Sequence, residues 1–176
     1  MRFLERLQRS VPFDLFGRGF TPLADKWDGL APYRYALAIE NHAVPHYWTE
    51  KVADCFLAWT MPLYFGAENL SAYFPAESFV WIDLADRAAP RRIAEVIRSN
   101  LWLRRRDAIA EARRRVLQEH QFFPVISRLV AQDPPTSAPQ LCRIPAVRSL
   151  SDYYVRTTPL QRTWHRLRRL PHRLGL

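Results

Sequence analysis

Residues 33–66 carry the stretch YRYALAIENHAVPHYWTEKVADCFLAWTMPLYFG, which decides the fold. The run Arg34–Ile39 is mostly apolar and has the length of a strand, and a polar loop follows it. A helix is predicted for residues 50–59, because four apolar residues recur there at i, i+3, i+4 and i+7 and Thr49 stands where an N-cap is needed. Pro62–Phe65, directly before a glycine, predicts a second buried strand. The stretch is therefore a strand–loop–helix–strand unit.

Further short elements are predicted on both sides of this unit. They are a helix over 3–9, a strand over Phe13–Phe16, a helical turn or two over 24–30, a short helix over 68–73, a strand over 79–82, and one long helix over 90–120. Short strands separated by helices indicate a parallel sheet that is covered on both faces. We therefore expect an α/β fold with a Rossmann-like parallel sheet, followed by a helical basic tail.

The 176 residues suffice for one hydrophobic core but hardly for two complete α/β domains. A globular domain is predicted for 1–125, a Pro/Ser/Thr-rich linker for 126–152, and a basic amphipathic tail for 153–176. The net charge of +9 is due mainly to Arg after position 90 and indicates an anionic partner. The tail combines six Arg with a leucine-rich face, which is typical of a segment that lies on an anionic membrane surface. Nucleic acid is not expected, because no recognisable nucleic-acid-binding module accompanies the charge.

Several classes of site and location are not supported by the sequence. Cys55 and Cys142 lie far apart and lack ligand spacing, so neither a disulfide framework nor a metal site is expected. The chain has no apolar run long enough to span a membrane and no signal peptide. We expect a cytoplasmic protein that binds the inner membrane face peripherally.

The loop after Arg34–Ile39 holds the candidate functional residues. In an open parallel sheet, ligands bind beyond the carboxyl ends of the strands. A helix that begins near Thr49 directs unpaired N–H groups at that region, which suits a phosphate, and Lys51 adds a positive charge. Glu50 has two oxygens that can accept both hydroxyls of a ribose, and Tyr47 can pack on a sugar or a base.

The same residues resemble the signature of the α-1,3-fucosyltransferases, glycosyltransferase family 10. The family pattern is matched, in order and spacing, by Tyr33-Arg34-Tyr35, Ile39-Glu40-Asn41, Tyr47-Trp48-Thr49-Glu50-Lys51 and Pro62 to Gly66. The resemblance covers about residues 1–97. It implies the C-terminal, GDP-fucose-binding half of a two-domain GT-B fold.

The resemblance also implies the roles of four binding residues. Glu50 would bind the ribose hydroxyls, Lys51 the diphosphate, and Asn41 and Tyr47 the diphosphate–fucose region. The implied reaction is an inverting transfer of fucose to a glycan acceptor, with the catalytic base in the N-terminal domain and without a metal or other cofactor. That acceptor domain is missing here, and the family's phosphate-binding Arg would fall before Met1. We therefore expect the isolated chain to bind GDP-fucose weakly and to transfer nothing.

Each of these residues also has a structural interpretation. Glu50 and Lys51 can form a solvated first helical turn, Asn41 can be a left-handed turn residue, and Tyr47 can belong to the core. Arg34 can point into the crevice or cap the sheet edge, and we favour the edge. The Arg-rich helix has acidic partners at i, i+4, which favours a solvated face.

Two hypotheses for the whole chain remain. The chain is a fucosyltransferase domain, or it is a truncated relic that holds a nucleotide sugar or a membrane without catalysis.

Overall fold

A computed structural model describes residues 2–17 and 19–132. The chain divides into two compact units, Met1–Pro134 and Pro135–Leu176, and the second lies outside the described residues. The predicted basic tail and its membrane contact therefore also lie outside them. Helix α6, Phe122–Gln132, extends past residue 125, the predicted end of the globular domain. In the described part, no helix is both long and apolar enough to cross a membrane.

The centre of the first unit is a parallel sheet in the order β1-β2-β3. Its strands are β1, Tyr35–Ile39, β2, Met61–Phe65, and β3, Val80–Trp81. Along β1 and β2, Leu37 stands beside Leu63 and Ala38 beside Tyr64, so neighbouring side chains point to the same face. The predicted α/β fold with a parallel sheet is confirmed.

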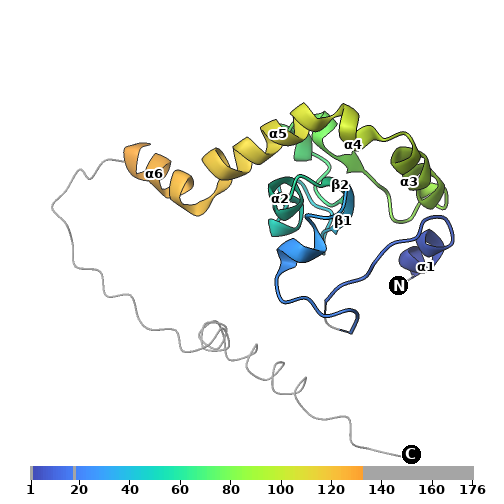
Figure 1. Ribbon diagram of the computed structural model, residues 1–176. Helices are drawn as coiled ribbons and strands as arrows, with labels where there is room; N and C mark the ends of the chain where they lie inside the picture. Colours follow the sequence, from blue (N-terminus) through green and yellow to red (C-terminus); the bar gives the residue numbers. More distant parts are fainter. Residues whose placement is uncertain (1, 18, 133–176) are drawn as a thin grey trace, which may run out of the picture. The chain divides into compact units, whose positions relative to one another are not determined.

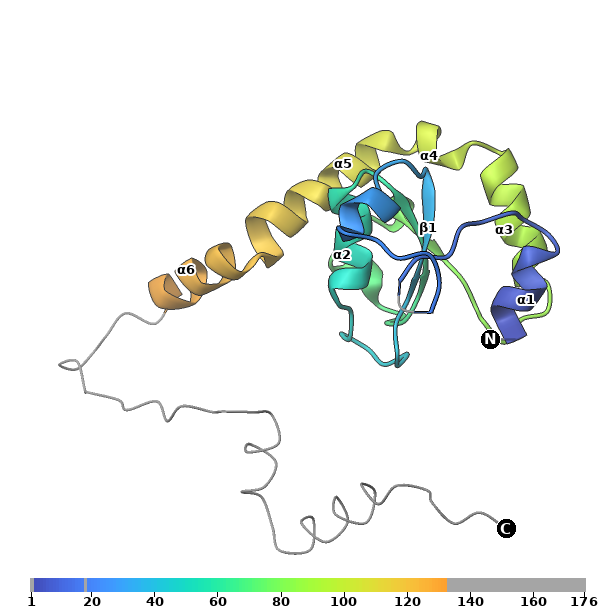
Figure 2. The same ribbon diagram turned by 60° about the horizontal axis from the view of Figure 1, so that its bottom comes forward.

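Helices cover both faces of the sheet (Figure 1). Helix α2, Glu50–Leu57, packs Val52, Cys55 and Phe56 on one face, in a buried cluster with Ala38 and Tyr64. Helices α1, Arg2–Gln8, and α3, Ala89–Arg98, lie on the other side, and Figure 2 shows the same division. That second cluster is built on Leu7, Leu63, Ile82 and Ile93. Successive residues of β1 therefore pack alternately in two apolar layers, one on each face of the sheet.

The single long helix predicted over 90–120 is wrong. The chain forms α3, then α4, Leu101–Arg104, α5, Arg106–Arg115, and the short π-helix η4, Val116–His120. The break falls at Asn100, which has a left-handed backbone with φ 52° and ψ 39°. This turn lets the Trp102 backbone N–H donate to the Tyr35 hydroxyl at 2.9 Å and its indole N–H donate to the Trp59 carbonyl at 2.7 Å. Two long-range hydrogen bonds therefore interrupt a helix that local pattern alone would continue.

Two shorter elements also differ from the sequence predictions. Residues 24–30 form the 3-10 turn η1, Lys26–Gly29, as expected, whereas 68–73 form only the 3-10 turn η2, Leu70–Ala72, in place of a short helix. A further turn, η3, covers Ala76–Ser78. The strand predicted over Phe13–Phe16 is wrong, because only one isolated bridge, Phe16 to Thr21, forms there. An extended segment needs a neighbouring strand to become part of a sheet, and the described residues supply none beside it.

Arginines on α5 make two kinds of contact. Arg114 and Arg115 pair with Glu111, both at 2.8 Å or less, and lower the pKa of its carboxyl to about 2, as the predicted solvated face implies. Arg106 instead lies over the rings of Trp102 and Trp59, at 4.7 and 5.1 Å. These cation–π contacts join α5 to Trp102 on α4 and to Trp59 between α2 and β2, and they were not indicated by charge pattern. Arg34 also lies over the Trp102 ring, at 5.3 Å. It stands at the amino end of β1, away from the crevice at the carboxyl end, so the interpretation that it caps the sheet edge is confirmed.

Candidate functional site

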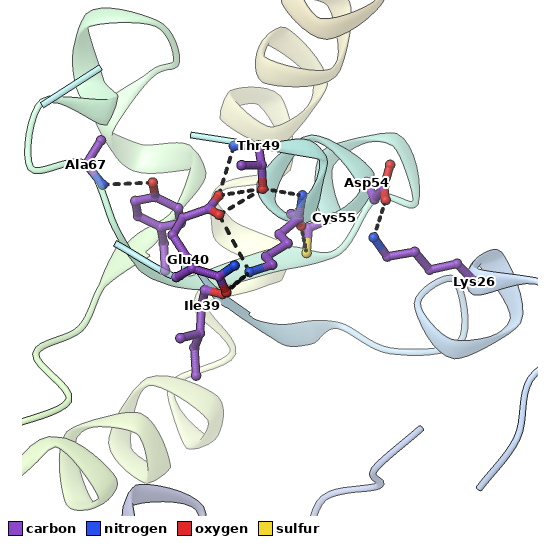
Figure 3. Close-up of polar contacts among 10 residues, drawn as sticks. Lys26, Ile39, Glu40, Thr49, Asp54, Cys55 and Ala67 are labelled. Carbon is purple, nitrogen blue, oxygen red and sulfur yellow. Dashed lines mark hydrogen bonds and ion pairs between the residues drawn. The ribbon is translucent and has the colours of Figure 1, made fainter. Parts of the chain in front are cut away.

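The carboxyl end of β1 is joined to the start of α2 by one buried carboxylate. Glu40 follows the strand directly, and its side chain is fully buried. It accepts hydrogen bonds from the Thr49 backbone N–H at 2.9 Å and from the Thr49 hydroxyl at 2.8 Å (Figure 3). A carboxylate at this place is favoured by the positive end of the helix dipole. Glu40 therefore holds the two ends of the loop between β1 and α2 next to each other.

Thr49 is the N-cap of α2, as predicted. Its backbone is extended, with φ −131° and ψ −173°, and its hydroxyl oxygen accepts the Lys51 backbone N–H at 3.3 Å. The hydroxyl thus accepts from the helix while it donates to Glu40. Because both groups are tied, the first turn of α2 has a fixed position relative to β1.

Lys51 reaches back from α2 to the strand end. Its ammonium donates to the Ile39 carbonyl at 2.9 Å and to the Asn41 amide oxygen at 3.0 Å, and it lies 3.8 Å from a Glu40 oxygen. The Lys51 side chain stays 32% exposed. The contact uses the oxygen of Asn41 and leaves its NH2 group as a donor for another partner. Two of the four predicted binding residues are thus brought together.

The other two predicted residues face solvent. Glu50 is the first residue of α2 and is exposed, and no ion pair or side-chain hydrogen bond of Glu50 occurs within the described part of the chain. Tyr47 is 36% exposed and meets His42 edge-on at 6.0 Å, so its core interpretation is wrong. The left-handed interpretation of Asn41 is also wrong, because the positive φ of this loop belongs to His46, at 65°. That the four residues bind a ligand stays a prediction.

His46 and Asn69 tie this loop to the segment after β2. The His46 backbone N–H donates to the Asn69 amide oxygen at 2.8 Å, and a His46 ring nitrogen lies 2.6 Å from the Tyr73 hydroxyl. Sequence reasoning missed this contact, since the two segments are separated by a strand and a helix. It fixes the middle of the loop, as Glu40 fixes its base.

The end of β2 packs closely against the same carboxylate. The Tyr64 hydroxyl accepts the Ala67 backbone N–H at 2.9 Å, and burial raises the pKa of the Tyr64 phenol. A Cβ at Gly66 would lie only 2.6 Å from Glu40 Cγ and from Tyr64 Cζ. Glycine is therefore needed at this position, because the side chains of Glu40 and Tyr64 approach its backbone closely. The glycine directly after the predicted second strand is the sequence signal of this close contact.

Residues beside the site belong to the core. Trp48 packs edge-on against Tyr73, Phe74 and His120, with ring centroids 5.1 to 5.7 Å away. Burial lowers the pKa of the His120 imidazole, whose Nε2 is buried without a hydrogen-bond partner among the described residues. The Cys55 thiol donates to the Lys51 carbonyl at 3.2 Å, and burial raises its pKa to about 12.

A cavity of about 1120 Å³ lies away from this loop. Its walls include Leu7, Phe13, Leu15, Tyr35 and Leu37, and it contains none of the four predicted binding residues. The candidate site is thus an exposed surface at the strand end and not this cavity.

An open parallel sheet with a polar loop and a capped helix at its carboxyl end is the arrangement of a Rossmann-like α/β domain. The family model described as glycosyltransferase family 10 (fucosyltransferase) C-term matches residues 1–102. The chain belongs to this family.

Curated relatives and solved structures agree with this assignment. Residues of this chain are 29% identical over 102 residues to the human 4-galactosyl-N-acetylglucosaminide 3-alpha-L-fucosyltransferase FUT6 and to the human 3-galactosyl-N-acetylglucosaminide 4-alpha-L-fucosyltransferase FUT3. Each match covers 55% of this chain and 28% of the relative, so the chain spans less than a third of the length of these relatives. A crystal structure of an alpha1,3-fucosyltransferase with GDP-fucose superposes with a TM-score of 0.51 at 24% identity, covering 63% of this chain and 34% of that one. This likeness shows a shared fold.

Proposed function

We propose that the chain is the sugar-nucleotide-binding half of a fucosyltransferase, which holds GDP-fucose beyond the carboxyl end of β1. The family membership supports a glycosyl-transfer role, and a solved neighbour of the same fold contains GDP-fucose. The reaction would be an inverting displacement in which fucose passes to a glycan acceptor.

The observation that carries the proposal is the placement of Lys51 and Asn41. The Lys51 ammonium is held at the strand end by the Ile39 carbonyl and by the Asn41 oxygen, and it keeps part of its surface exposed. The same contact orients the Asn41 amide so that its NH2 group is available. An ammonium and an amide donor side by side suit the oxygens of a diphosphate, and they would stabilise GDP as it leaves.

Glu50 and Tyr47 complete the proposed donor site. The exposed Glu50 carboxylate in the first helical turn offers two acceptor oxygens to the ribose diol. The exposed ring of Tyr47 offers an apolar surface to the diphosphate–fucose region. Because both side chains face solvent, they can meet a ligand without displacing core contacts.

The charge of the loop sets the strength of this site. Glu40 and Glu50 carry two negative charges beside the single ammonium of Lys51, so the residues at this strand end do not neutralise a diphosphate. Further positive groups must come from another part of the complete enzyme. We therefore expect weak GDP binding by this chain, and the base that deprotonates the acceptor is not assigned to any described residue.

The test is a titration of the full chain with GDP, followed by calorimetry or by NMR at millimolar ligand. Glu50→Gln should weaken binding by roughly 1.5–3 kcal/mol, the value of a hydrogen bond to a charged group. Glu77→Gln, at an exposed position on a different turn, is the matched control and should bind as the wild type does. Lys51→Met should also weaken binding, and its melting temperature separates lost binding from lost folding.

Equal affinity in the wild type, Glu50→Gln and Lys51→Met would remove the proposed donor site. The contacts of Lys51 would then serve only the fold.

A further inference from the structure

The middle of the loop between β1 and α2 is a tight turn over residues 44–47. The Tyr47 backbone N–H donates to the Val44 carbonyl at 3.2 Å, and His46, the third residue of the turn, has a φ of 65°. A proline at the second position, Pro45, together with a positive φ at the third defines a type II turn. The third position favours glycine or asparagine, because a Cβ crowds the backbone there. Histidine is therefore an unfavourable residue at this position, and other contacts must hold the turn.

Asn69, in the segment after β2, supplies these contacts. Its amide oxygen accepts the His46 backbone N–H at 2.8 Å, and its amide nitrogen lies 3.1 Å from His46 Nδ1. Turns of type I and type II differ by a flip of the central peptide, which reverses the direction of this N–H. Only the type II orientation points the His46 N–H at Asn69. The hydrogen bond therefore selects the turn type.

Tyr73 holds the residues on both sides of Tyr47. Its hydroxyl lies 2.6 Å from His46 Nδ1, and its ring packs edge-on against Trp48, with centroids 5.7 Å apart. Both Tyr73 and Trp48 pack against the buried cluster that contains Phe56 of α2. Between these two held residues, Tyr47 is 36% exposed. The turn and its anchors thus present the Tyr47 ring to solvent at the strand end.

We propose that Asn69 is a positioning residue of the donor site, which acts through Tyr47. By accepting the His46 N–H it keeps the turn in the type II form, and this form directs the Tyr47 ring toward the diphosphate–fucose region of the ligand. The inference rests on the proposed function, in which Tyr47 meets that region. Asn69 does not touch the ligand in this scheme; it raises the fraction of molecules whose loop is ready to bind.

The size of the effect follows from the backbone of His46. Without the Asn69 acceptor, a left-handed residue that carries a Cβ is disfavoured by a factor of roughly ten. The apparent affinity falls in proportion to the fraction of the binding-competent form. Asn69→Ala should therefore raise the Kd for GDP-fucose about tenfold, while the amide spectrum of β1 and α2 shows that the variant is folded.

The experiment is an NMR titration of the full chain with GDP-fucose, combined with an NOE measurement of the turn. In a type II turn the His46 N–H lies next to the Pro45 Hα, and in a type I turn it points away, so this NOE reports the turn type without a ligand. The NOE should be strong in the wild type and weak in Asn69→Ala. Ser71→Ala, at an exposed position on η2, is the matched control and should change neither the NOE nor the Kd.

Two double variants separate positioning from a merely structural role. Glycine adopts a positive φ without strain, so adding His46→Gly to Asn69→Ala should restore the NOE and most of the affinity. When Tyr47 is already replaced by alanine, Asn69→Ala should raise the Kd by less than about twofold, because the residue through which it acts is gone.

Three results would overturn the proposal. They are an unchanged Kd in Asn69→Ala, an equal loss of affinity with and without the Tyr47 ring, and a double variant that regains the type II turn but not the affinity. A wild-type chain that binds neither GDP nor GDP-fucose would refute the proposed function and this inference with it. Wild-type binding that Asn69→Ala leaves intact would refute the inference alone.

Discussion

Replacement of Glu40 by Gln tests the role of the buried carboxylate most directly. The substitution keeps the size of the side chain but replaces one acceptor oxygen by an NH2 donor. Both oxygens of Glu40 face donors, namely the N–H and hydroxyl of Thr49 and the ammonium of Lys51. The new NH2 group must therefore face at least one donor, and the ion pair is lost.

The magnitude follows from these contacts. A hydrogen bond to a charged group contributes about 1.5–3 kcal/mol, and leaving a buried partner unpaired adds to the loss. The ammonium lies 3.8 Å away but is 32% exposed, so solvent screens most of the attraction and only a fraction of about 1 kcal/mol is expected from it. Together Glu40→Gln should lower the free energy of unfolding by about 2–4 kcal/mol. For a chain of this size that is a fall in melting temperature of roughly 10 °C.

The assay is thermal and urea unfolding followed by circular dichroism. Glu50→Gln is the matched control, since it makes the same chemical change at an exposed position ten residues further on, and it should shift stability by less than about 0.5 kcal/mol. Equal melting temperatures for the two variants would refute the reasoning, because the buried hydrogen bonds of Glu40 would then contribute nothing to stability.

Three further predictions concern the core around the site. Gly66→Ala should destabilise the chain by about 1–3 kcal/mol in urea unfolding, because the added Cβ has no room beside Glu40; wild-type stability would show that the strand end can move aside. Burial lowers the pKa of His120 in the folded chain, so the unfolded chain takes up a proton first as the pH falls. The free energy of unfolding should therefore decrease as the pH drops through about 6.5. His120→Phe should flatten the dependence of this free energy on pH in that range, and an unchanged slope would contradict the prediction. The thiol of Cys55, with a pKa of about 12, should resist iodoacetamide at neutral pH until the chain unfolds, as peptide mass spectrometry can show, and rapid labelling in the folded chain would disprove its burial.

The local parts of the fold could be predicted from the sequence because their signals are local. The apolar run of β1, the helical stripe of α2 and the cap at Thr49 each depend on residues within one or two turns, and each is found as expected. The contact between Lys51 and Asn41 follows from the same unit, since a strand end and the next helix start are adjacent.

The remaining features depend on partners that are distant in the sequence. The break at Asn100 is fixed by hydrogen bonds of Trp102 to Tyr35 on β1 and to Trp59 just before β2, which no helical period reveals. The segment Phe13–Phe16 has the composition of a strand, but a strand exists only where a neighbour pairs with it. The importance of Glu40 was also hidden, because a carboxylate in a polar loop gives no sign that it will be fully buried.

The bond between Glu40 and Thr49 has a consequence for how this loop can evolve. It closes the chain at the base of residues 41–48, so the strand and the helix keep their positions whatever lies between. Once the ends are joined, each doubling of loop length costs only about 0.6 kcal/mol of closure entropy. Between these fixed ends, the tip is tied to the segment after β2 through His46, so changes in sequence or length elsewhere at the tip leave the strand and the helix in place.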